Sequence, residues 1–161
     1  MRLGTTPHYR YQLKVDVEPT ERETITSALE DEPFELGELL GLPKLMKQIE
    51  DGGLDIEASS ESQLARFESD IEVLSVYLPQ YVIGKEVFVR PTRGAPILEG
   101  WMIVGRSGQV VRLVLDVRWD ANAEQIVDSG PDLDAIVERW GNLPEWVRDA
   151  MRLSHPRLRA L

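Results

Sequence analysis

The feature that most constrains the fold is a strict two-residue alternation near the start of the chain. Between residues 8 and 17, apolar side chains occupy every second position, at Tyr9, Tyr11, Leu13 and Val15 and again two residues later. The intervening positions are polar or charged. Because successive side chains of a β-strand point to opposite faces, this pattern predicts a strand with one buried face.

A second pattern, with the three- and four-residue spacing of a helix, lies between residues 60 and 78. Its apolar stripe comprises Leu64, Phe67, Ile71, Leu74 and Leu78. Such a stripe is typical of a helix that packs one side against a core. Its length of about two heptads favours a core-facing helix over a coiled coil.

Shorter apolar patterns, read together with the positions of proline and glycine, predict the remaining elements. A single helix kinked at Pro43 is the alternative to two separate helices on either side of that residue. We predict helices near 20–32, 36–40, 43–51, 131–140 and 144–151, and strands at 54–58, 82–90, 97–104 and 110–120.

Together these elements predict one α+β domain that spans residues 1–161. We expect a mainly antiparallel sheet of about four or five strands, with helices packed on one face, in the order β-α-α-α-β-α-β-β-β-α-α. Both alternating strands, 9–17 and 111–119, are expected to turn their apolar sides toward helix 60–78. Segment 121–130 is polar without periodicity and is the most favourable position for a weak boundary. Residues 154–161 are expected to form a flexible tail.

The composition excludes several classes of chemistry. The chain has no cysteine, which excludes disulfide scaffolds, thiolate zinc sites and thiol nucleophiles. Its two histidines, His8 and His155, stand at opposite ends and fit neither a zinc nor a triad motif. No glycine-rich phosphate loop is present. We therefore predict no metal, no cofactor and no catalytic residue, and we expect binding in preference to catalysis.

The same sequence lacks the long apolar segments that target a chain to membranes. No window approaches the roughly 20 apolar residues of a membrane-spanning helix. The opening residues, 1–11, lack the apolar stretch of a secretion signal. We therefore expect a cytoplasmic protein that does not associate with membranes.

Negative charge is concentrated in the first half of the chain. The net charge is −10, and residues 1–70 account for −9 of it. A patch of this kind attracts a basic partner, whereas the simpler interpretation is solubility and support of a helix dipole. Our leading hypothesis is a non-catalytic interaction protein, such as an inhibitor, an immunity-type protein or an adaptor, that binds a basic protein. The candidate contact residues are Glu30, Asp31, Glu32, Glu35 and Glu38.

Two other hypotheses place the function on the sheet. A small-ligand site or an active site could form on the polar face of the strands, and its candidate residues include the loop arginine Arg93. A weaker alternative is nucleic-acid binding through Arg90 and Arg93, although an acidic protein repels phosphate backbones. The polar groups proposed for the ligand site are Arg90, Arg93, Arg112, Asp116 and Arg118.

Overall fold

The computed structural model describes residues 8–14, 22–32, 41–51, 53–58, 67–78, 81–90, 92–120, 122 and 125–161. Short 3-10 turns occur at Trp140–Asn142 and Pro156–Leu158. The helices and strands are β1 (His8–Lys14), α1 (Arg22–Leu29), α3 (Leu42–Glu50), β2 (Leu54–Ala58), α4 (Phe67–Tyr77), β3 (Val82–Arg90), β4 (Ile97–Arg106), β5 (Gln109–Asp120), β6 (Gln125–Pro131), α5 (Leu133–Arg139) and α6 (Glu145–Ser154).

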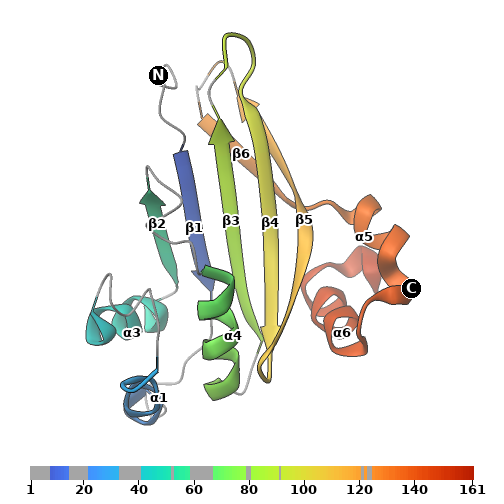
Figure 1. The fold of residues 1–161 in the computed structure, drawn as a ribbon. Helices are drawn as coiled ribbons and strands as arrows, with labels where there is room; N and C mark the ends of the chain where they lie inside the picture. The colour runs from blue at the N-terminus through green and yellow to red at the C-terminus, as the bar shows by residue number, and fades with distance from the viewer. Residues whose placement is uncertain are drawn as a thin grey trace.

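The described chain forms one antiparallel sheet of six strands, in the order β2-β1-β3-β4-β5-β6 (Figure 1). The α+β class is confirmed, but the expected number of four or five strands is wrong. The additional strand is β6, which lies where the sequence predicted a polar boundary at 121–130. It pairs with β5 across a register shift between Leu115 and Val117. An edge strand with such an irregularity does not need an alternating pattern, and its sequence therefore gave no strand signal.

The order of elements agrees with the prediction up to β5, within the described residues. The helix expected at 36–40 lies outside them, and so do the ends of the strand and helix predicted at 15–17 and 60–66. A tight turn joins β4 and β5, and its residues Ser107 and Gly108 both have positive φ angles, of 52° and 82°. Ser75 of α4 fixes this turn, since its Oγ accepts a hydrogen bond from the Gly108 amide at 2.9 Å.

One face of the sheet is covered by α4, with α1 and α3 packed beside it (Figure 1). Tyr11 and Leu13 of β1 contribute to this core, as the alternation predicted. The buried side chains of this first core are Tyr11, Leu13, Ile25, Leu29, Leu45, Met46, Leu54, Phe67, Ile71, Leu74, Leu78, Val82 and Ile103.

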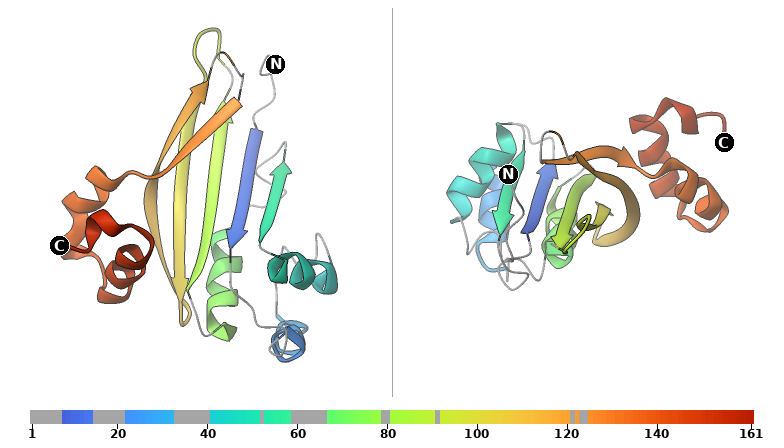
Figure 2. Two further views of the ribbon diagram at one scale, coloured as in Figure 1. Left: turned by 180° about the vertical axis from the view of Figure 1, so that it is seen from behind. Right: turned by 90° about the horizontal axis from the view of Figure 1, so that it is seen from above.

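A second core occupies the other face, so the expectation that helices cover one face is wrong. Ile103 pairs with Arg112 across β4 and β5, and directly paired residues share a face. Arg112 therefore faces the α4 side, whereas Leu113 and Leu115 pack against residues of α5 and α6. The C-terminal helices lie beyond β5, away from α1, α3 and α4 (Figure 2). The apolar alternation at 111–119 correctly predicted that one side of this strand is buried. The helices that cover this side are α5 and α6, whereas the sequence predicted helix 60–78.

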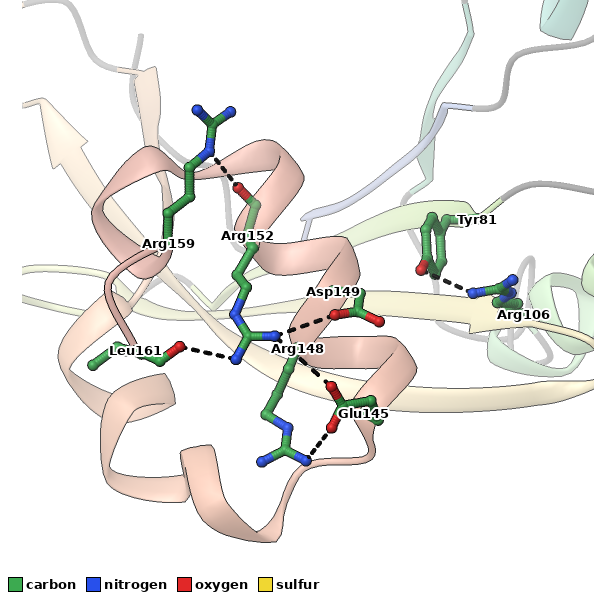
Figure 3. Close-up of polar contacts among 8 residues, drawn as sticks. All are labelled: Tyr81, Arg106, Glu145, Arg148, Asp149, Arg152, Arg159 and Leu161. Atoms are coloured by element: carbon green, nitrogen blue, oxygen red, sulfur yellow. Dashed lines mark hydrogen bonds and ion pairs between the residues drawn. The ribbon is translucent and has the colours of Figure 1, made fainter.

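Residues 154–161 contact the preceding helix and the second core, and the flexibility predicted for them stays a prediction. Leu158 has 2% of its surface exposed and belongs to the second core. The Arg152 guanidinium donates to Asp149 at 3.2 Å and to the carbonyl oxygen of Leu161 at 2.9 Å (Figure 3). Arg159 in turn donates from Nε to the carbonyl oxygen of Arg152 at 3.2 Å (Figure 3). The contacts of Arg152 with Leu161 and of Arg159 with Arg152 join residues nine and seven positions apart, whereas Asp149 and Arg152 are three positions apart on α6.

Candidate functional site

A cleft of about 510 Å³ opens on the α4 side of the sheet. The strands β3 and β4 extend past α4 there (Figure 1). The cleft takes side chains from α4 and from strands β1, β3, β4 and β5. Within the described chain it is lined by Tyr9, Phe67, Glu68, Ser69, Glu72, Glu86, Phe88, Arg90, Glu99, Trp101 and Arg112.

Two glycines explain why α4 covers one part of the sheet and leaves the cleft beside it. A Cβ atom added at Gly84 would collide with the Ile71 side chain, and one at Gly105 would lie 2.9 Å from Ile71 Cγ2. The helix can therefore approach the sheet closely at these two positions. Further along β3, on the same face, stand the large side chains Glu86 and Phe88. The change from glycine to large side chains along one strand face marks the start of the cleft.

Aromatic rings form one wall of the cleft. Tyr9 and Phe88 are directly paired across β1 and β3, and their rings stack with centroids 4.7 Å apart. The Arg90 guanidinium lies over the Phe88 ring at 5.3 Å. Phe67, at the start of α4, contacts Tyr11 with ring centroids 5.1 Å apart and connects this wall to the first core. These contacts fix the rings before any ligand arrives.

Arg112 links the strands to the helix at the opposite side of the cleft. Its Nη2 lies 2.7 Å from Glu68 Oε2 and 3.5 Å from Glu86 Oε2, and its guanidinium lies 5.3 Å from the centre of the Trp101 ring. Since the Arg112 and Glu68 side chains are 36% and 40% exposed, such a pair contributes only about 0.2–1 kcal/mol to stability. Its main effect is to hold three charged side chains and one ring in fixed positions.

The structure brings together two of the five residues predicted for a ligand site on the sheet. Arg90 and Arg112 line the cleft. Asp116 and Arg118 do not, and they form an ion pair with each other at 2.9 Å on β5. Arg93 is exposed in the turn between β3 and β4 and also lies outside the cleft lining. Binding of nucleic acid by Arg90 and Arg93 stays a prediction.

The acidic residues proposed as a partner surface are described only in part. Glu30 and Asp31 are exposed after α1. Glu32 accepts a hydrogen bond from the Tyr77 hydroxyl at 2.5 Å, and this bond raises the pKa of Tyr77. Glu35 and Glu38 lie outside the described residues. Binding of a basic protein through this group stays a prediction.

Other acids of the first seventy residues are paired with arginines on the sheet. Asp55 accepts two hydrogen bonds from Arg10, at 3.0 and 2.6 Å, and these bonds lower the pKa of the Asp55 carboxyl. Glu68 is paired with Arg112. The charge of these two carboxylates is therefore balanced locally, which weakens the case for one continuous acidic surface.

Several lining residues were not among the predicted site residues. Phe88 and Trp101 fall within the predicted strands 82–90 and 97–104, but the sequence did not connect them with Glu86 or Glu99. Phe88 pairs with Glu99, and Glu86 pairs with Trp101, across β3 and β4. The signal that would have found them is this register, because charged residues inside otherwise apolar strands meet their partners on the neighbouring strand.

Among the described residues, no cluster of three or more potential metal ligands occurs. The described helices include none with the length and hydropathy that crossing a membrane requires. Comparison with protein-family models, with curated protein sequences and with solved structures finds no match for this chain.

Proposed function

We propose that the protein binds a small organic molecule in the cleft between α4 and the extended strands β3 and β4. The observation that carries this proposal is the cleft itself, with a volume of about 510 Å³ and a lining of aromatic and charged side chains. Ligand pockets in proteins typically enclose about 300–1,000 Å³ and combine apolar walls with a few fixed polar groups.

The composition of the lining suits a ligand with an apolar body and at least one polar group. Tyr9, Phe88 and Trp101 contribute aromatic rings to the lining, and contact with such rings is favourable for aromatic ligands. Arg112, Glu68 and Glu86 hold one another in place, so these groups do not need to be ordered when a ligand binds. This preorganisation lowers the entropy cost of binding.

Ser69 offers a direct test, because it is exposed, lines the cleft and lies in the first turn of α4. We expect Ser69→Trp to occupy part of the cleft and so obstruct a ligand. The matched control is Val76→Trp, which places the same bulk at a position on the same helix that is 59% exposed and does not line the cleft. Circular dichroism would verify that both variants are folded.

The probes for this test share one ring system and differ in charge: indole, indole-3-acetate and tryptamine. We expect isothermal titration calorimetry to detect binding of at least one of them to the unmodified protein. Ser69→Trp should weaken that binding at least about tenfold, equivalent to ~1.4 kcal/mol, and Val76→Trp should leave it unchanged. Absence of binding by all three probes, or binding that Ser69→Trp does not affect, would overturn the proposal.

A further inference from the structure

We infer that the ligand of this cleft carries a positively charged amine beside an aromatic or apolar body. This inference rests on the proposed function and specifies the ligand class. Its starting point is the charge of the cleft. The described lining contains four carboxylates, from Glu68, Glu72, Glu86 and Glu99, and two guanidinium groups, so its formal charge is −2.

Both arginines of the cleft already interact with groups of the protein. Arg112 is paired with Glu68 and Glu86, and Arg90 lies over the Phe88 ring. An anionic ligand would have to compete with these carboxylates for Arg112, and displacing an exposed pair of this kind carries a small cost. The positive charge in the cleft is therefore largely committed before a ligand arrives.

Two of the carboxylates remain available. Glu72 and Glu99 line the cleft, both are exposed, and neither side chain forms an ion pair with another residue in the described part of the chain. Glu72 belongs to α4 and Glu99 to β4, so the two carboxylates stand on different walls. An ammonium group has three N–H donors and can donate a hydrogen bond to the carboxylate on either wall.

The aromatic rings favour the same sign of charge. Glu99 is directly paired with Phe88, which itself stacks on Tyr9. The protein's own guanidinium groups already lie over Phe88 and Trp101, each 5.3 Å from the ring centre. A ring face attracts a cation through its quadrupole, and more strongly where water is excluded. Free carboxylates beside such rings therefore select a cation with an apolar body.

The charge of the whole molecule acts in the same direction at longer range. With a net charge of −10, the protein attracts cations and repels anions before contact, and this steering weakens as salt increases. A small free amine, in which an aromatic ring and an ammonium group are separated by a short linker, satisfies all of these conditions. Tryptamine is a suitable probe, since its ring is identical to that of neutral indole and of anionic indole-3-acetate.

The experiment compares the affinities of these three probes by isothermal titration calorimetry at low and high salt. We expect tryptamine to bind at least about tenfold more tightly than indole-3-acetate, with an affinity that decreases as salt is added. Glu99→Gln and Glu72→Gln should each weaken tryptamine binding several-fold and leave indole binding unchanged. Glu138→Gln, at an exposed position of α5 outside the cleft, is the matched control and should have no effect.

The outcomes separate this inference from the proposed function. Binding of indole or indole-3-acetate that is as tight as that of tryptamine, and that Ser69→Trp abolishes, would overturn the charge inference and leave the ligand site in place. Binding of tryptamine that neither Glu99→Gln nor Glu72→Gln affects would also overturn it. If a capped Gly-Lys-Gly peptide bound more tightly than tryptamine, the inference of a small free amine would be overturned. The ammonium group recognised by the cleft would then belong to a lysine of a peptide. Absence of binding by every probe would overturn both proposals.

Discussion

At the scale of single residues, Gly84 and Gly105 determine where the cleft begins. Each lies opposite Ile71 of α4 at a distance that leaves no room for a Cβ atom. Beyond Gly84, Glu86 and Phe88 are too large to lie beneath a helix packed at that separation, and they line the cleft. The absence of two side chains therefore positions the helix, and the helix in turn defines one wall of the site.

His155 provides a test at the same scale, on the opposite side of the sheet. Burial, and secondarily the nearby charge of Lys85, lower the pKa of His155 below its ordinary value of 6.5. The unfolded chain therefore binds this proton more readily, and the contribution of His155 to stability is present above pH 6.5 and is lost as the pH falls below that value. We expect His155→Gln to remove this loss. Urea unfolding at pH values above and below 6.5 measures this loss in the free energy of unfolding.

The comparison uses the change in unfolding free energy with pH, because the substitution can also alter stability at neutral pH. The unmodified protein should lose more stability on acidification than His155→Gln. Parallel pH profiles for the two proteins would show that the surroundings of His155 do not disfavour its protonation.

At the scale of elements, α4 connects the first core with the cleft. Leu74 is 0% exposed and belongs to the first core, whereas Glu68, Ser69 and Glu72 of the same helix line the cleft. We expect Leu74→Ala to lower the free energy of unfolding by roughly 2–5 kcal/mol, since it removes buried methyl groups and leaves a cavity. Chemical denaturation measures this change.

The matched control for this prediction is Leu153→Ala on α6, where the side chain is 71% exposed. Loss of an exposed leucine should cost less than about 0.5 kcal/mol. If Leu74→Ala were as mild as Leu153→Ala, the packing of α4 on the sheet would be wrong, and with it the wall of the cleft.

At the scale of the whole molecule, the sequence predicted the class and most elements but not the two-sided arrangement. Within the described residues 8–14, 67–78 and 109–120, the alternations and the helical stripe correctly predicted two strands with a buried side and a helix. An alternating pattern states that one side of a strand is buried and does not state which helix buries it. The side is set by cross-strand register, as in the pairing of Ile103 with Arg112, and register depends on contacts between distant segments.

The same limit applies to the candidate site. The sequence identified Arg90 and Arg112 as polar residues of the sheet, and the structure places both at the cleft. The sequence could not show that Arg90 and Arg112 line the cleft while Asp116 and Arg118 do not. The position of a β5 residue relative to α4 depends on the tertiary structure. The acidic patch predicted around Glu30 stays a prediction, and it is separate from the carboxylates of the cleft, which lie on α4, β3 and β4.

The ligand site is tested most directly by titrating the isotopically labelled full chain with tryptamine and following the amide and indole NMR resonances. We expect saturable shifts concentrated at residues that line the cleft, including Phe88, Glu99 and the indole N–H of Trp101, and no shift at Glu30 or Asp31. Saturable shifts centred on Glu30 and Asp31, or no saturable shift at any residue, would contradict the assignment of the cleft as a site for aromatic amines.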